Sequence, residues 1–174
     1  MIFLQFFVKV LKILRSGATP KQLASGMVLG MILGLTPLWS LHNLVIVLLV
    51  ILIDVNLAMF LLGFGIFSGI AYLLDPIFHS TGYWLLVDVT FLKGLWTSLY
   101  NMPVAVLFRM NNTVILGSLV ISLLLITPCY WLTKHGVILY RFRIDPVVQK
   151  WKIVQALKSS KLISIYNKLK KLGD

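Results

Sequence analysis

The stretch "GMVLGMILGLTPLWSLHN", residues 26–43, is apolar enough for a membrane but is interrupted by a proline at position 37. A helix that crosses a bilayer by itself needs about 20 apolar residues, so this one ends too early. Gly26, Gly30 and Gly34 repeat every four residues and share one helical face, on which a second backbone can approach closely. The stretch therefore predicts one arm of a helical hairpin with Pro37 in its turn.

The residues around this stretch define both arms of the hairpin. The sequence "TPKQ" at 19–22 has the pattern of a helix start, with Thr as the N-cap, Pro in the first helical position and Gln three residues after the cap. We expect helices over residues 20–36 and 39–53. Each arm is about 24 Å long, shorter than a hydrocarbon core of about 30 Å, so the hairpin either spans a thinned bilayer or is re-entrant.

The glycine face of the first arm has two interpretations. The simpler one is tight packing against the second arm of the same hairpin, and the alternative is a groove that admits a lipid chain or a substrate. His42 and Asn43, which follow the turn closely, either stabilise it or bind a headgroup or a partner.

Asp54 ends an uninterrupted aliphatic run and precedes Asn56. Both residues are good N-caps for a third helix, which we expect over residues 57–74 with Asp75 and Pro76 at its end. An ionisable group beside an apolar span is also a functional hypothesis, so a role of Asp54 in proton or ligand coupling is the alternative to capping.

The remainder of the chain predicts one more span and two amphipathic ends. A fourth helix is expected over residues 113–131 with a kink near Pro128, after a segment, 76–112, whose mixed composition is typical of the membrane interface. We divide the chain into an amphipathic interfacial helix at 1–18, a membrane domain at 19–134 and a basic cytoplasmic amphipathic helix at 135–174. Candidate headgroup-binding bases lie in both flanking segments: Lys9, Lys12, Arg15, Arg141 and Arg143.

The composition identifies a multi-pass membrane protein. Hydrophobic residues make up 59% of the 174 residues, and 16 Lys and Arg stand against five acids, all of them Asp. Bases clustered beside apolar spans are typical of membrane orientation signals and of contacts with anionic headgroups, not of nucleic-acid binding. Their positions predict that both termini lie in the cytoplasm. The predicted fold is an all-α membrane protein with a short helical hairpin, two further transmembrane helices and amphipathic interfacial helices at both termini.

The sequence favours a protein that is not an enzyme. It has no glutamate, no GxSxG or HExxH motif and no glycine-rich phosphate loop, and its single cysteine, Cys129, has no plausible His partner. Asp75, His79 and Asp88 have spacings that match no closed metal site. We expect no cofactor and no metal. The candidate residues for binding a lipid or a partner are Gly26, Gly30, Gly34, Pro37, Trp39, His42, Asp54 and Asn56.

The stretch from residue 19 to residue 86 resembles a widespread bacterial inner-membrane domain of unknown function. The matching residues are Pro20, Ala24, Gly26, Gly30, Pro37, His42, Asn56 and Pro76. The chain departs from the pattern at Ser40, where a glycine is more usual in the turn. The resemblance implies the architecture of a Gly-rich hairpin with a proline turn followed by an Asn-started helix. It also implies that stand-alone members accompany a large AsmA-like envelope protein.

These observations lead to three hypotheses for function. The first is a non-enzymatic subunit of the bacterial inner membrane that docks a larger AsmA-like, membrane-anchored protein and assists phospholipid transfer toward the outer membrane. The second is a small solute or ion transporter or channel, for which loss of flux in Asp54→Asn is the discriminating result. The third is a structural protein that shapes the membrane without a partner.

Overall fold

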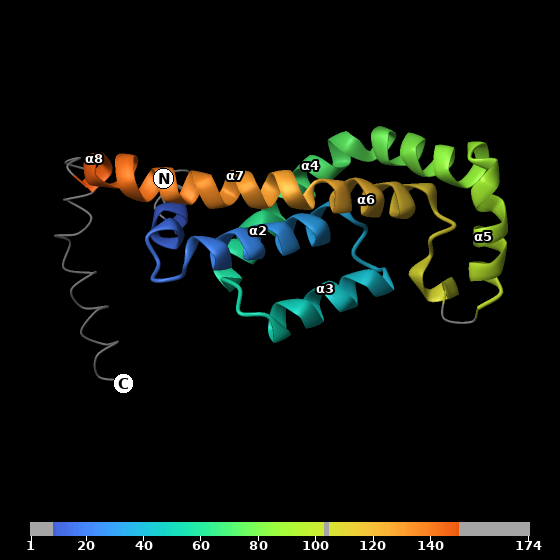
Figure 1. The fold of residues 1–174 in the computed structure, drawn as a ribbon, viewed down its shortest axis with the longest axis horizontal. Helices are drawn as coiled ribbons and strands as arrows, with labels where there is room; N and C mark the ends of the chain where they lie inside the picture. The colour runs from blue at the N-terminus through green and yellow to red at the C-terminus, as the bar shows by residue number, and fades with distance from the viewer. Residues whose placement is uncertain (1–8, 103–104, 150–174) are drawn as a thin grey trace. The chain divides into compact units, whose positions relative to one another are not determined.

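The computed structural model describes residues 9–102 and 105–149, and every regular element in these ranges is a helix (Figure 1). The predicted all-α class is therefore confirmed for the described part of the chain. Contacts divide the chain into two compact units, Met1–His135 and Gly136–Asp174.

The first arm of the hairpin is α2, Pro20–Leu35, and its predicted start is confirmed. The Thr19 hydroxyl accepts the Gln22 N–H at 3.2 Å, and the Gln22 side-chain oxygen accepts the Thr19 N–H at 2.7 Å. This reciprocal pair satisfies two backbone donors that a helix start leaves free. The helix ends at Leu35 because Pro37 disfavours helical geometry in the residue before it.

The second arm is α3, Leu41–Leu52, and the third helix is α4, Leu57–Tyr83. The prediction that Asp75 and Pro76 end the third helix is wrong, because Pro76 lies inside α4. A proline interrupts only the local hydrogen bond and an apolar helix tolerates it where neighbouring packing compensates. Phe78, which is fully buried two residues later, supplies that packing.

The helical path of α4 continues through the π-helical segment η1, Trp84–Asp88. Part of the segment expected at the interface therefore belongs to the long helix. Three short elements follow, η2 (Thr90–Leu92), α5 (Lys93–Tyr100) and η3 (Ala105–Phe108). The Trp96 indole N–H donates to the Leu85 carbonyl at 3.0 Å and ties α5 to the end of this helical path.

The last span predicted from the sequence is divided into α6, Thr113–Leu124, and α7, Ile126–Leu139. The helices on either side of the break are bent by 47°, which confirms the predicted kink. Its cause is Pro128, whose ring clashes with the carbonyl four residues earlier, at Leu124, where α6 ends.

The second unit contains the end of α7 and two further helical segments. These are the π-helical η4, Tyr140–Ile144, and α8, Asp145–Gln149. The Tyr140 hydroxyl donates to the Asp145 carboxylate at 3.2 Å. In this unit the helical path continues from η4 into α8 without a break, and the expected amphipathic helix beyond residue 149 lies outside the described residues.

The glycine face of α2 packs against α4, not against α3. A Cβ added at Gly26 would lie 2.6 Å from the Asn56 carbonyl oxygen, and one at Gly34 would lie 2.8 Å from that of Phe64. A Cβ at Gly30 would overlap the Phe60 carbonyl. Because the contacts advance in the same direction along both helices, α2 and α4 are parallel. The predicted close backbone approach is confirmed, and the predicted partner helix is wrong.

The side chains of α3 and α4 explain why the glycine face of α2 packs against α4. Helix α4 contributes a glycine of its own, Gly63, which faces the backbone of Met27. Helix α3 is a row of large aliphatic residues without glycine, so its backbone cannot come as close. Figure 1 shows α3 running apart from α2, joined to it by the turn.

A second close contact joins α4 to α6. A Cβ added at Gly117 would overlap the Phe78 carbonyl, and one added at Gly82 would overlap the Thr113 carbonyl. The order of these contacts makes α4 and α6 antiparallel. Phe78 sits between the helices and belongs to one buried core cluster with four residues of α2, namely Val28, Met31, Ile32 and Leu35.

Length and composition allow one described helix, Leu57–Asp88, to cross a membrane. A second crossing results if the bent pair Thr113–Leu124 and Ile126–Val147 counts as one span. Helix α3 is apolar but shorter. The number of crossings and the orientation of the termini stay predictions.

The glycine contacts give a matched pair of substitutions. We expect Gly30→Ala to lower the free energy of unfolding by about 1–3 kcal/mol, because the methyl group forces the α2 and α4 backbones apart. Gly65→Ala is the control, because a Cβ there meets nothing within 4 Å. It should raise stability by about 0.5–1 kcal/mol through the unfolded-state entropy of glycine. Denaturant titration in detergent micelles, followed by tryptophan fluorescence, measures both, and equal effects would contradict this packing.

Candidate functional site at the hairpin turn

The turn between α2 and α3 is held by the side chain of Asn43. Its amide nitrogen donates to the Pro37 carbonyl at 2.8 Å and to the Leu38 carbonyl at 3.3 Å. The Thr36 hydroxyl lies 2.8 Å from both the Asn43 side-chain oxygen and the Ile32 carbonyl oxygen. Since Asn43 and Thr36 are both buried, these bonds satisfy polar groups that water does not reach. The predicted turn role of Asn43 is confirmed.

Ser40 takes the place of the glycine that the family resemblance leads us to expect. Its backbone has φ −136° and ψ 144°, an extended conformation that every residue adopts. The Ser40 hydroxyl also donates to the Pro37 carbonyl at 2.5 Å. The turn therefore does not require glycine at this position, and serine adds one hydrogen bond to it.

His42 begins α3 next to Asn43 and is only 7% exposed. Neither of its ring nitrogens has a hydrogen-bond partner among residues 9–102 and 105–149. A buried polar ring without a partner costs free energy, so the described structure gives no binding role to this side chain.

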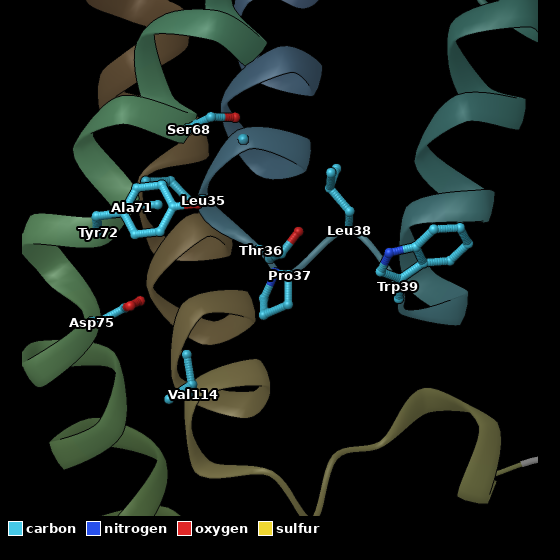
Figure 2. A pocket seen from close by; sticks show the side chains of 11 residues that line it. Leu35, Thr36, Pro37, Leu38, Trp39, Ser68, Ala71, Tyr72, Asp75 and Val114 are labelled. Carbon is cyan, nitrogen blue, oxygen red and sulfur yellow. The ribbon is translucent and has the colours of Figure 1, made fainter.

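A hollow of about 390 Å³ lies between the turn, α4 and α6, and we call it the turn hollow (Figure 2). Its walls combine the turn with one face of α4 and the start of α6. The lining residues are Gly34, Leu35, Thr36, Pro37, Leu38, Trp39, Ser68, Ala71, Tyr72, Asp75 and Val114. Three predicted site residues, Gly34, Pro37 and Trp39, are among them. Asp75 is the one charged residue in this lining.

A second hollow, of about 380 Å³, lies between α2, α4 and the bend that joins α6 to α7. We call it the bend hollow. Its lining is almost entirely apolar and consists of Met27, Met31, Ile66, Phe67, Leu125, Pro128, Cys129, Leu132 and Thr133. Cys129, the only cysteine of the chain, is half-buried there.

The opposite end of the hairpin carries a separate polar cluster. The Asn56 side chain accepts the Met59 N–H at 2.8 Å, which confirms it as the cap of α4. The Asn56 N–H donates to the Gln22 carbonyl at 3.2 Å. The Asp54 carboxylate accepts the Gln22 side-chain amide at 2.5 Å. The prediction that Asp54 caps the third helix is wrong, because its carboxylate binds the first turn of α2 instead.

The predicted site residues are thus divided among three places. Gly34, Pro37 and Trp39 lie at the turn hollow, with His42 following on α3. Gly26 and Gly30 are buried in the α2–α4 contact. Asp54 and Asn56 lie at the other end of the hairpin and line neither hollow.

Two residues of the turn hollow, Tyr72 and Asp75, were not predicted as site residues. The sequence did contain a signal for Asp75, because it is the first charge after the start of α4 at Leu57. No such signal marks Tyr72, whose place at the hollow depends on the register between α2 and α4.

The candidate headgroup-binding bases lie at both ends of the described chain. Residues 9–14 are helical, with Lys9 and Lys12 exposed and Arg15 half-buried directly after them. In the second unit, η4 carries Arg141, which is half-buried, and Arg143, which is exposed. Among the described residues, no group of three His, Cys, Asp or Glu side chains is placed to hold a metal ion.

Comparison with known proteins agrees with the predicted resemblance. A family model described as "uncharacterized protein conserved in bacteria (DUF2062)" matches residues 5–144. An uncharacterized protein of Treponema pallidum (strain Nichols) is 30% identical over 135 residues, which cover 78% of this chain and 83% of the relative. No solved structure gives a significant match.

The hydrogen bonds of the turn give a prediction on Asn43. We expect Asn43→Ala to lower the free energy of unfolding by about 1–3 kcal/mol, because the buried carbonyl and hydroxyl groups around it lose their partner. The control is Leu44→Ala at the next residue, whose side chain is exposed. Hydrogen exchange in detergent should show faster exchange of the turn and the first turn of α3 in Asn43→Ala only. Unchanged exchange in Asn43→Ala would contradict this role.

Proposed function

This chain belongs to the uncharacterized bacterial family DUF2062, and we propose that it is a non-enzymatic subunit of the inner membrane. In this proposal it docks the transmembrane end of a larger, AsmA-like envelope protein and assists the transfer of phospholipid toward the outer membrane. The chain crosses the membrane more than once, with both termini in the cytoplasm. The AsmA-like partner is inferred from the family resemblance.

The observation that carries the proposal is the exposure of α3. His42 and Asn43, in its first turn, are buried and Ile46 packs against the core, whereas one face of the helix beyond the first turn presents large apolar side chains outward. These exposed residues include Leu44, Val45, Val47, Leu48, Ile51 and Leu52. A continuous apolar surface of this kind is typical of a helix that contacts lipid or another protein. It is held by the turn at one end and by the residues before α4 at the other.

The bend hollow supports the lipid part of the proposal. Its walls offer almost no polar group, since the residues that line it are nearly all apolar. In a bilayer, an apolar hollow of this size is filled by acyl chains, since water gains no hydrogen bonds there. The bend hollow is therefore a place for a lipid chain beside the contact between α2 and α4.

The charge distribution supports the proposed orientation. Bases lie near the start of α2 and in the second unit, whereas the stretch over residues 75–112 carries Lys93 and Arg109 beside Asp75 and Asp88. Cytoplasmic segments carry an excess of Lys and Arg, so both ends of the chain are placed on the cytoplasmic side. The same bases attract the anionic headgroups of that leaflet.

The test is co-purification from native membranes with a substitution in α3. The tagged wild-type chain should retain a large AsmA-like protein together with phospholipid. In Leu48→Trp we expect the retained partner to fall by about fivefold or more, because a bulky ring displaces a packed helix. Leu61→Trp, at an exposed position of α4, is the control and should retain the partner.

Quantitative mass spectrometry of the eluted proteins measures both variants. Absence of an AsmA-like protein from the wild-type eluate, or equal loss in the two variants, would contradict the proposal. Vesicle remodelling by the purified chain alone would instead support the membrane-shaping hypothesis.

A further inference from the structure

The turn hollow lies at the level where the apolar part of α4 ends. Residues 57–74 form a run of 18 residues without a charge, and Asp75 follows directly. At 1.5 Å per residue this run is about 27 Å long, close to the hydrocarbon thickness of about 30 Å. Because α2 and α4 are parallel, the hairpin turn reaches the same level as Asp75, and both line the turn hollow. In the proposed membrane placement, this is the level of the headgroups on the far side.

The charge in the turn hollow is a lone carboxylate. Figure 2 shows the Asp75 side chain directed from α4 toward Pro37 and Val114. The lining contains no Lys, Arg or His to neutralise it. At a membrane surface, where the surroundings are less polarisable than water, a carboxylate attracts a cation more strongly than it does in solution. The hollow is therefore complementary to a small positively charged group.

Two exposed aromatic residues accompany the carboxylate. Trp39 is 88% exposed and Tyr72 is 82% exposed, although both line the hollow. Aromatic faces attract ammonium groups, and Trp and Tyr are enriched at the headgroup level of membranes. The Trp39 indole N–H and the Tyr72 hydroxyl are also donors that suit a phosphate oxygen.

We propose that the turn hollow binds the headgroup of an aminophospholipid, a lipid with a primary ammonium group next to its phosphate. Asp75 pairs with the ammonium, and Trp39 and Tyr72 border the headgroup. A volume of about 390 Å³ is within the range of small-molecule sites. The inference deepens the proposed function and rests on it for the position of the turn at the membrane surface, since it names the lipid class that the subunit holds.

A lipid is favoured over a lysine or arginine of a partner protein by the place of the hollow. It opens at the headgroup level beside aromatic residues that suit the membrane interface, and lipid is present there at high concentration. The exposed surface proposed for the partner is α3, whose large apolar residues from Leu44 onward do not line this hollow.

The experiment measures lipid preference in the full-length chain. The purified protein is titrated in detergent with phosphatidylethanolamine, phosphatidylglycerol or N-acetylated phosphatidylethanolamine of identical acyl chains, and bound lipid is counted by native mass spectrometry. The basic segments also bind the two anionic lipids, so preference is measured as the ratio of the affinity for phosphatidylethanolamine to that for each of them. We expect Asp75 to raise this ratio in the wild type by binding the ammonium of phosphatidylethanolamine. In Asp75→Asn the affinity for it should fall about three- to fivefold, the effect of one accessible ion pair.

Asp88→Asn is the matched control, because Asp88 is an exposed acid at the end of the same helical path but does not line the turn hollow. It should keep the wild-type preference. The inference is overturned if Asp75→Asn keeps the wild-type preference, or if both substitutions reduce it equally. Free ethanolamine competing as well as the lipid would also overturn it, since a free amine would then be the ligand.

Co-purification of the partner with Asp75→Asn separates this inference from the proposed function. Lost lipid preference with a retained partner supports the headgroup site and leaves the docking proposal standing. Lost partner with unchanged lipid preference overturns the headgroup site in favour of a cationic side chain of the partner. Absence of a partner from the wild type, with lipid preference intact, contradicts docking alone.

Discussion

The fold depends on the direct backbone contact between α2 and α4. At Gly26, Gly30 and Gly34 no Cβ fits, since the carbonyls of α4 occupy the space that it would need. Small residues at this spacing let two helix backbones come into close van der Waals contact, which larger side chains would prevent. The spacing of three glycines fixes the rotation and the register of α2 on α4, and with them the level of the turn.

Two parallel helices that are near neighbours in the chain need a connection that runs back between them, and α3 is that connection. Its first turn is held by hydrogen bonds, since the Asn43 amide donates to the carbonyls of Pro37 and Leu38. At the other end, Asp54 accepts the Gln22 amide and Asn56 caps α4. The connecting helix is therefore fixed at both ends, while most of the aliphatic side chains between them stay exposed.

Local features were predictable from the sequence, and the choice of partner helix was not. The capping box at Thr19, the cap at Asn56 and the kink caused by Pro128 each depend on residues within one helical turn. The partner of the glycine face depends on which of two helices allows the closer backbone approach. Nearness in the sequence favoured α3, whereas α4 is the partner. Pro76 was misread for a similar reason, because the packing of Phe78 on α2 and α6 outweighs a local helix breaker.

The turn hollow combines features that the sequence keeps far apart. Pro37 and Trp39 belong to the hairpin, Asp75 follows the apolar run of α4, and Val114 lies at the start of α6. The glycine register brings the first two to the level of Asp75, and the antiparallel contact at Gly117 brings in the last. A lone acid after an apolar run is by itself an ordinary membrane boundary. What distinguishes Asp75 is its position beside the proline turn and two exposed aromatic rings. That position follows from the glycine contact between α2 and α4.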